Sequence, residues 1–549
     1  MYTAFLRGVA LAALTLLAGA PIAAQSVTGR VLSAQTDAAL AGVTLLVDGT
    51  TVGTMTDPDG RFSLDFPDGA ETITASFVGY QTETVAATPG DNVTIRLRVA
   101  TTDLQPVVVS ASRSARARAE VPVAVATISA ADLQATRPNL LAEALNRTTG
   151  VYMVDLGNEQ HAMAIRQPFS YKPLFLYLED GVPIRPAGLF NHNALIEVNQ
   201  GGVEQIEVVR GPGSALYGAG AIGGAVNFVT QTPSAADPIA TSARGGSYGY
   251  GRVDASGAAR SGNLGLFAAG YVAGQRDGLR EHSDYDKVSL TARADLDLDP
   301  RTRLTLTGTY NDLVTDTDGS LDSLNFFSDG FTSLQTFTNR DVQAGRAALR
   351  LDRQWAGGQR SSVTAFGRTN SVAQNPHYRL RIDSDDPSQA TGEVNDNAFT
   401  SLGVQAQHEA ALGPVRLLAG ATVDRSPASY IATRTEVTRD PDTGVFTSFT
   451  DTGELMTDYD VVLLNTAGFV QAEVQALRDL RIVGSLRADR VGYDFDNALP
   501  PGSFSGVVDT TNSYARITPR LGVIWAPTPE RGLYANASQG FLPPEAGEL

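Results

Sequence analysis

Few side chains in this sequence are of the kinds that carry enzyme chemistry. The 549 residues include no cysteine and only five histidines, which excludes thiol catalysis, disulfides and cysteine zinc sites. The histidines form neither an i,i+4 pair nor an H-E-x-x-H motif, so a fixed metal site is not expected. No nucleophile–base pair or acid pair stands in a recognisable catalytic setting. We therefore expect neither an enzyme nor a resident cofactor.

The charge balance removes a second class of function. The chain has 59 acidic against 42 basic residues and a net charge of −17. A duplex nucleic acid would be repelled unless a local basic patch opposed this charge, and the sequence has none. We expect no nucleic-acid partner.

One glycine motif is typical of a nucleotide site. Gly218, Gly220 and Gly223 satisfy G-x-G-x-x-G, which holds pyrophosphate only where a helix N-terminus follows the glycines. Here residues 225–230 follow, and they read Ala-Val-Asn-Phe-Val-Thr, a pattern typical of a strand. The sequence therefore argues against a dinucleotide site.

The first residues form an export signal. Arg7 precedes a short apolar run that ends in small residues, as in a secretory signal peptide over 1–24. Cleavage is expected between Ala24 and Gln25. The run is shorter than the ~20 residues of a spanning helix, and no long apolar run follows it. A membrane-embedded mature chain would therefore be a β-barrel, because only helices and closed barrels satisfy their backbone in lipid.

Residues 25–102 alternate apolar and polar side chains with the period of a strand. Turn signals separate the alternating segments, so we expect a small antiparallel β-sandwich. Asp57 and Asp59 could ligate calcium or stabilise a turn through their side chains, and the turn is favoured. The apolar positions are Phe62, Leu64, Phe66, Ile73, Ala75, Phe77, Val93, Ile95, Leu97 and Val99.

The same region resembles the carboxypeptidase regulatory-like domain. That domain is an accessory sandwich without catalytic residues, so the resemblance adds no enzyme function. The matching segments are Val27-Thr-Gly-Arg-Val, Leu40-Ala-Gly-Val-Thr-Leu, Gly53 to Phe62 and Phe77-Val-Gly-Tyr80.

Residues 118–232 combine helix signals with several strand-like runs. Ser129-Ala-Ala-Asp132 is a capping-box pattern, and the apolar face of a second helix lies within 140–145, before Gly150. Five motifs follow in a fixed order and resemble the plug domain of TonB-dependent outer-membrane receptors. They are Asp180-Gly-Val-Pro, Val203-Glu-Gln-Ile-Glu-Val, Arg210-Gly-Pro, Tyr217-Gly and Gly223-Gly-Ala-Val-Asn-Phe228.

The resemblance implies a transducer-binding segment, the TonB box, ahead of the plug. Residues 103–113 occupy that place, and a short β-branched run suits strand addition to a partner. The implied partner is the periplasmic TonB energy transducer. The box residues are Asp103, Leu104, Gln105, Pro106, Val107, Val108, Val109, Ser110 and Ala111.

The resemblance also implies a ligand site at the outward apex of the plug and ion pairs that latch the plug to the barrel. Arg166 and Arg210 are the expected latch residues, with ordinary surface charge as the alternative. A cation, an aromatic ring and polar groups at the apex suit an anionic metal chelate, while turn capping remains the alternative for the asparagines. The expected ligand residues are His161, Tyr171, Arg185, Phe190, Asn191, His192 and Asn193.

Residues 233–549 carry roughly a dozen alternating segments typical of a transmembrane antiparallel barrel. Leu304, Leu306 and Tyr310, for example, alternate with threonines. Three polar stretches, 313–340, 376–399 and 427–460, are expected to be loops. Plugged barrels need about 22 strands, more than this length provides, so we expect the N-terminal part of a truncated barrel.

The expected fold class is mainly β: a sandwich, an α+β plug and a partial barrel. The expected function is TonB-dependent transport of a ferric siderophore, another metal chelate or cobalamin across the outer membrane of a Gram-negative cell. An oligosaccharide or nutrient receptor, or a non-transporting binding or signalling module, are the alternatives. The expected partners are outer-membrane lipid, TonB, the small ligand and an accessory surface protein.

Overall fold

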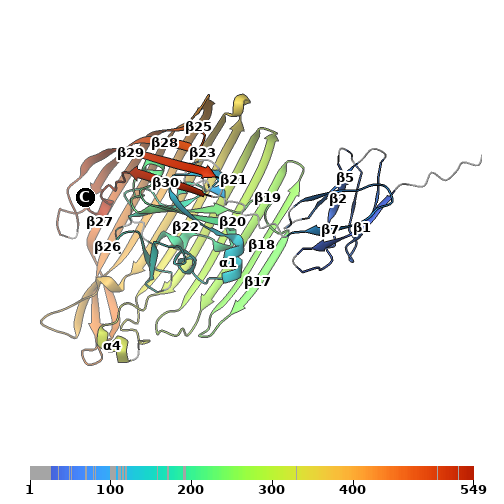
Figure 1. Cartoon of the computed structure of the whole chain (residues 1–549). Coiled ribbons are helices and arrows are strands. Elements are labelled where there is room, and N and C mark those ends of the chain that lie inside the picture. The colour runs from blue at the N-terminus through green and yellow to red at the C-terminus, as the bar shows by residue number, and fades with distance from the viewer. Residues whose placement is uncertain are drawn as a thin grey trace, which may run out of the picture. The chain divides into compact units, whose positions relative to one another are not determined.

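The computed structural model divides into two compact units, Met1–Gln105 and Pro106–Leu549, which are described separately (Figure 1). It describes residues 26–548 except 35, 49, 51, 68–70, 78–79, 81, 99–106, 109–112, 114–115, 118–119, 158, 170–171, 173, 190–192, 329, 504 and 529–530. The expected signal peptide, with Ala24 and Gln25, lies outside the described residues.

The first unit is a β-sandwich of two small sheets. Alternation places Phe62, Leu64 and Ile95 in its buried core, as predicted. One sheet has the order β4 (Arg61–Asp65), β1 (Ser26–Ser33), β7 (Asn92–Leu97), and the other β3 (Gly53–Met55), β2 (Thr44–Val47), β5 (Thr72–Ser76), β6 (Glu83–Ala86).

The sandwich differs from the expected one in a single pairing. β1 and β7 run parallel, and the strands of both sheets between them in sequence supply the long crossover connection that a parallel pair needs. The Asp57 side chain accepts hydrogen bonds from the backbone of Asp59 and Arg61, at 2.9 and 2.8 Å. Asp57 thus stabilises a turn, as favoured.

The plug opens the second unit and combines a mixed sheet with short helices. Ser129 and Asp132 form the predicted capping box at the start of α1 (Ala130–Thr136), and α2 is Leu141–Leu145. The sheet order is β10 (Ala124–Ser129), β15 (Val203–Arg210), β16 (Gly224–Thr230), β13 (Phe175–Glu179), β14 (Val182–Pro183). Beside it lie the hairpin β11 (Val151–Asp155) and β12 (His161–Ile165), and the short helices η2 (Ala194–Glu197), η3 (Gln200–Gly202) and α3 (Ser214–Tyr217).

The glycines at 218, 220 and 223 lead into β16, a buried central strand. The predicted strand after the glycines is thus confirmed, and a strand presents no helix N-terminus to a pyrophosphate. β16 pairs antiparallel with β15 and parallel with β13.

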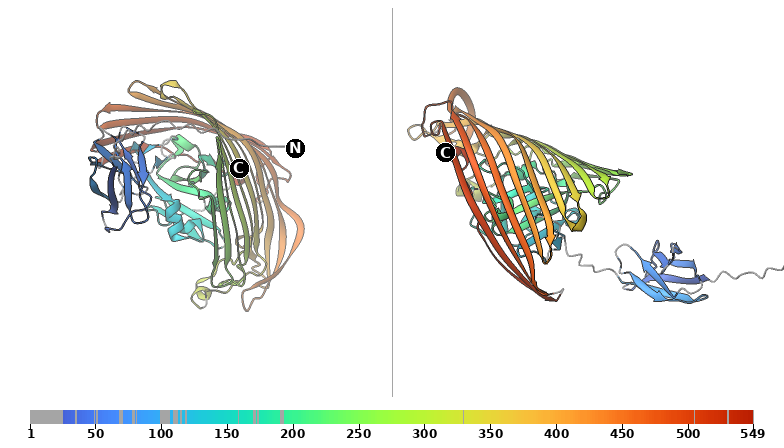
Figure 2. Two further views of the ribbon diagram at one scale, coloured as in Figure 1. Left: turned by 90° about the vertical axis from the view of Figure 1, so that its right-hand side faces the viewer. Right: turned by 90° about the horizontal axis from the view of Figure 1, so that it is seen from above.

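Residues 239–538 form one curved sheet of 14 strands within the described residues, and Figure 2 shows it wrapped around the plug. Each neighbouring pair along the main path is antiparallel, and β24 (Arg381–Ile382) pairs with β25 at the side. The path is β17 (Ile239–Gly245), β18 (Gly251–Ser261), β19 (Leu264–Gln275), β20 (Tyr285–Asp299), β21 (Thr302–Asp316), β22 (Asn339–Gln354), β23 (Arg360–Asn375), β25 (Gln389–Leu412), β26 (Val415–Arg439), β27 (Phe446–Leu477), β28 (Leu480–Asn497), β29 (Thr510–Thr528), β30 (Arg531–Ser538).

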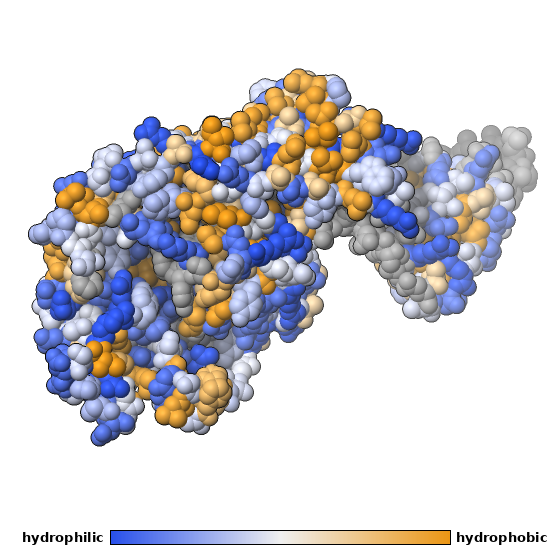
Figure 3. Space-filling model, turned by 60° about the vertical axis from the view of Figure 1, so that its left-hand side comes forward, coloured by the Kyte–Doolittle hydropathy of each residue, from blue (hydrophilic) through white to orange (hydrophobic). Residues whose placement is uncertain are grey.

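The two faces of this sheet differ in polarity, as the alternation predicted. On β21, Leu306 and Tyr310 are 51% and 42% exposed on the outer face, whereas Thr305 and Thr309 are 8% and 5% exposed against the plug. Apolar side chains also gather on the face seen in Figure 3. Apolar residues toward lipid and polar residues toward the interior are the arrangement of an outer-membrane sheet. In the part of the chain that the structure describes, no helix has the length and apolar character to cross a bilayer.

The connections alternate in length between the two ends of the sheet. Tight turns join β20 to β21 and β25 to β26. Long segments join β21 to β22 and β23 to β25. The long segments carry α4 (Ser323–Ser328) and η5 (His377–Arg379). Long connections mark the outer end of such barrels and short turns the periplasmic end.

The prediction of a loop at residues 427–460 is wrong. Residues 427–460 continue β26 and β27 into a long hairpin that turns at 440–445. Residues 447–454 are exposed, so they lack the alternation that marks a half-buried strand, although residues 448–451 pair their backbone with β26. The expected loops at 313–340 and 376–399 are shorter than predicted, because β21, β22 and β25 extend into their ends.

His161, an expected ligand residue, lies in the plug core. The ring is 3% exposed and packs edge-on against Tyr177, 6.1 Å between centroids. Its Nδ1 lies 2.8 Å from the carbonyl oxygen of Glu159. Burial lowers the pKa of His161 to about 4, which keeps the ring neutral near pH 7.

We predict that His161 makes the folded protein less stable in mild acid. The ring takes up a proton near pH 6.5 when unfolded but only near its pKa of about 4 when folded, so the free energy of unfolding falls as the pH drops through this window. Urea titrations at pH 7 and pH 5 should show a loss of about 2 kcal/mol that is absent in His161→Gln. His408→Gln, which removes an exposed ring, is the control and should keep the loss. Equal pH dependence in wild type and His161→Gln would contradict the prediction.

Candidate functional site

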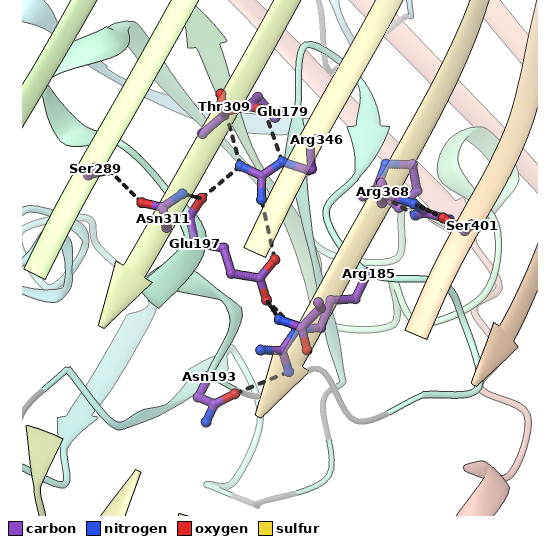
Figure 4. Close-up of polar contacts among 12 residues, drawn as sticks. Glu179, Arg185, Asn193, Glu197, Ser289, Thr309, Asn311, Arg346, Arg368 and Ser401 are labelled. Carbon is purple, nitrogen blue, oxygen red and sulfur yellow. Dashed lines mark hydrogen bonds and ion pairs between the residues drawn. The ribbon is translucent and has the colours of Figure 1, made fainter. Parts of the chain in front are cut away.

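A buried polar network joins the plug to the inner face of the sheet (Figure 4). At its centre the Arg185 Nε donates to Oε1 of Glu197 at 2.6 Å. The side chains are 2% and 1% exposed. Arg185 Nη1 also donates to Oδ1 of Asn193 at 3.2 Å. Two of the expected ligand residues, Arg185 and Asn193, are thus joined directly by a hydrogen bond.

Arg346 of β22 binds two plug carboxylates. Its Nε donates to Glu179 Oε2 at 3.0 Å, and its Nη1 lies 3.3 Å from Glu197 Oε2. Its Nη2 donates to the backbone oxygen of Glu197 at 2.7 Å. A guanidinium with five donors in a rigid fork suits such a junction. We call Arg185, Glu197, Arg346 and Glu179 the central latch.

Neighbouring strands add contacts from the sheet to the plug backbone. Arg368 on β23 donates to the carbonyl of Pro183 at 2.8 Å, and Asn311 on β21 donates to that of Glu197 at 2.6 Å. Asn370 on β23 donates to Glu197 Oε1 at 3.0 Å. These bonds fix the plug against several strands at once.

The expected latch residues lie elsewhere. Arg166 is exposed at the end of β12 and has a positive φ of 54°. Arg210 donates to the carbonyl of Thr149 at 2.6 Å, inside the plug. Both arginines lie beside Gly150 and neither belongs to the central latch, so their role as plug-to-barrel latch residues stays a prediction.

A signal for the central latch is present in the sequence. Glu197 is the single charge in the run Ala194-Leu-Ile-Glu-Val198, and a charge in an apolar run is buried only with a partner. On β22, Arg340, Arg346 and Arg350 are an even number of residues apart, which places them on the same face of the strand. Neither signal says which carboxylate meets which arginine.

The described part of the expected TonB box is docked on the plug. Val107 and Val108 form β8 (Val107–Val108), which pairs with β9 (Arg116–Ala117). The Val108 side chain is fully buried in a valine cluster with Val125 and Val209. The residues Asp103, Leu104, Gln105, Pro106, Val109, Ser110 and Ala111 lie outside the described residues.

Arg113 anchors the segment that follows β8. Its guanidinium lies over the Phe469 ring, 4.7 Å from the centroid, and its Nη2 donates to Gln405 Oε1 at 3.0 Å. The carbonyl of Arg113 accepts a bond from Gln407 at 3.0 Å. Since Gln405 and Gln407 belong to β25, this segment is tied to the sheet as well as to the plug.

A cavity of about 640 Å³ lies between the plug and the long connections, which we call the outer cavity. Plug residues Leu156, Gln160 and Arg185 line one side. The sheet and its connections supply arginines and aromatic rings to the other side, among them Arg340, Arg379, Tyr378, Tyr430 and Phe399. The volume is in the range of small-molecule sites.

The outer cavity includes few of the expected ligand residues. Arg185 lines it, and Asn193 supports Arg185. His161 lines a different, much smaller pocket. Tyr171, Phe190, Asn191 and His192 lie outside the described residues. Among the described residues, no group of three His, Asp or Glu side chains is arranged to hold a metal ion.

Three family models match successive parts of the chain. The CarboxypepD_reg-like domain matches residues 27–109, the TonB-dependent Receptor Plug Domain 117–225, and the TonB dependent receptor-like beta-barrel 427–549.

Two curated relatives are transport receptors. The vitamin B12 transporter BtuB of Vibrio vulnificus is 31% identical over 183 residues, which are 33% of this chain and 28% of the relative. The metal-pseudopaline receptor CntO of Pseudomonas aeruginosa is 26% identical over 381 residues, 62% of this chain and 51% of the relative. The chain thus spans at most about half of these two relatives.

Solved structures share the fold of the second unit. The unliganded ferric citrate transporter FecA superposes with a TM-score of 0.64 at 19% identity and covers 78% of this chain and 64% of its own. The ferripyoverdine receptor of Pseudomonas aeruginosa, bound to ferripyoverdine, gives 0.63 at 15% identity, with 83% and 62% covered. With its carboxypeptidase regulatory-like domain, plug and β-barrel segment in succession, the chain belongs to the TonB-dependent receptors.

Proposed function

We propose that this chain is the plug-bearing part of an outer-membrane importer that takes up a small ligand, a metal chelate or cobalamin, with energy from TonB. The outer cavity carries the proposal, because it places a ligand-sized space above a plug that fills the curve of the sheet. The names of the relatives, a vitamin B12 transporter and a metal-pseudopaline receptor, agree with this range of ligands. Residues 1–24 would direct the chain to export.

The central latch explains why such an importer would need an energy source. Arg346 is 7% exposed and Glu197 1% exposed, and separating a buried ion pair leaves each charge without compensation. We therefore expect the plug to stay in its seat unless work is applied to it. A pull on the segment at 103–111 would supply the work, since β8 and Arg113 connect that segment to plug and sheet.

The transducer-binding role of the segment can be tested with Val108→Pro. Proline removes a backbone N–H and cannot extend a strand pair, so we expect the full chain to lose binding to the periplasmic domain of TonB. Binding would be measured by titration calorimetry in detergent. Val107→Ile keeps a β-branched residue and should bind as wild type does. Unchanged binding by Val108→Pro would overturn the proposed role of residues 103–111 in binding TonB.

The latch can be tested with Glu197→Gln. The neutral amide removes the buried negative charge that Arg185 and Arg346 share. The free energy of unfolding of the plug should therefore fall by about 3 kcal/mol. Urea concentrations at which the plug becomes sensitive to protease would measure this change. Glu120→Gln removes an exposed ion pair to the sheet, with Arg481 at 3.7 Å, and should shift the midpoint little. Equal shifts in the two variants would show that the central latch does not hold the plug.

A further inference from the structure

The arginines of the outer cavity differ in how their charge is compensated. Arg185 pairs with Glu197 at 2.6 Å, Arg280 with Asp318 at 2.9 Å, and Arg379 with Glu393 at 3.3 Å. Arg340 is the fourth arginine of the lining. No carboxylate of the described residues lies within ion-pair distance of it.

Arg340 is also the arginine whose orientation is fixed toward the cavity. It begins the interior face of β22 and is 4% exposed. Its Nε donates to Oε1 of Gln374 at 2.9 Å. Its Nη1 is buried and has no hydrogen-bond partner among the described residues.

Gln374 holds this orientation. Its amide donates to Oδ1 of Asn395 at 2.9 Å and to the hydroxyl of Tyr378 at 3.1 Å. With both ends of the Gln374 amide bound, the Nε edge of Arg340 stays on Gln374. The Nη1 edge is left for another acceptor.

A buried guanidinium with an open donor is costly by itself. Removing a charge from water costs several kcal/mol unless a counter-charge and hydrogen bonds replace the solvent. Here the counter-charge is not supplied by the described part of the chain. A ligand oxygen that carries negative charge would supply both the charge and the acceptor.

We propose that Arg340 is the anion-binding residue of the outer cavity and that the transported chelate is anionic, with a carboxylate or phenolate oxygen on Arg340. This inference rests on the proposed import function and narrows its ligand class, against neutral cobalamin and neutral oligosaccharides. Asp155 is the carboxylate on the cavity lining, where it faces four arginines, Arg185, Arg280, Arg340 and Arg379.

The aromatic part of the lining suits the body of such a chelate. Tyr378, Tyr430 and Phe399 line the same cavity, and the Tyr430 ring is stacked on Tyr459 at 5.6 Å between centroids. Specific small-molecule sites are usually lined by apolar and aromatic side chains, with a few charged or polar groups that orient the ligand. The rings would contact the apolar or planar portions while Arg340 holds the charge.

The first measurement needs no ligand. If Arg340 served the fold, Arg340→Gln would lower the melting temperature of the full chain in detergent, whereas an arginine kept for a ligand should give an unchanged or higher one. Arg379→Gln removes the same charge from the same cavity but strips Glu393 of its partner, and it should not raise the melting temperature. A clear loss of stability in Arg340→Gln alone would overturn the proposal.

The second measurement uses four probes of different charge: ferric citrate, a ferric tris-catecholate, cationic ferrioxamine B and neutral cyanocobalamin. We expect binding of at least one anionic chelate and weaker binding of the other two. Arg340→Gln should weaken the anionic chelate about tenfold or more, as for a lost charge-assisted hydrogen bond. Arg379→Gln should weaken it by less than about threefold, since an exposed and paired charge contributes little.

The outcomes separate the two proposals. Equal or tighter binding of ferrioxamine B or cyanocobalamin, or full affinity in Arg340→Gln, would overturn the role of Arg340 and leave the import function standing. Failure of all four probes to bind would overturn the import proposal and the ligand class with it.

Discussion

The fit between plug and sheet centres on a buried junction, in which Arg346 bridges Glu179 and Glu197. A guanidinium inside a protein is tolerated only when carboxylates and carbonyls replace its water. Here the carboxylates come from the plug and the arginine from β22. The plug can therefore occupy its seat in one orientation, because any rotation would leave Arg346 and Glu179 buried without an ion-pair partner. Asn311 and Arg368 add hydrogen bonds from the sheet to plug carbonyls, and Asn370 adds one to the Glu197 carboxylate.

This junction also accounts for the polarity of the sheet. The interior face must supply donors to the plug, while the exterior face must remain apolar, and the period of two in a strand meets both needs at once. On β21 the side chain of Thr309 donates to Glu179 at 3.1 Å, while its neighbour Tyr310 points outward and is 42% exposed. The same pattern that would match lipid therefore also places the groups that bind the plug.

The outer cavity arises where this close fit ends. Below it, plug and sheet are joined by paired charges, and above it the long connections diverge and bring Arg280, Tyr378 and Arg379 around an open space. Within that space Arg185 belongs to both regions, since it lines the cavity and pairs with Glu197 of the central latch. Asn370 likewise lines the cavity and donates to Glu197, so the cavity and the latch are in direct contact, a short path by which a bound ligand would act on the plug.

The sequence alone determined the class of the protein, because strand alternation, capping signals and glycine-rich turns are local properties. It predicted the sandwich core, the α1 capping box, the β16 strand after the glycines and the two faces of β21. It did not predict the parallel pairing of β1 and β7 or the long β26–β27 hairpin, which depend on contacts distant in sequence or on strands exposed on both faces. The latch role of Arg166 and Arg210 stays a prediction, and the sequence did not predict that Arg346 pairs with Glu179 and Glu197. Only the tertiary structure decides this, because an arginine and a carboxylate become partners through the register of separate elements, and residues 179, 197 and 346 meet only once the plug lies inside the curved sheet.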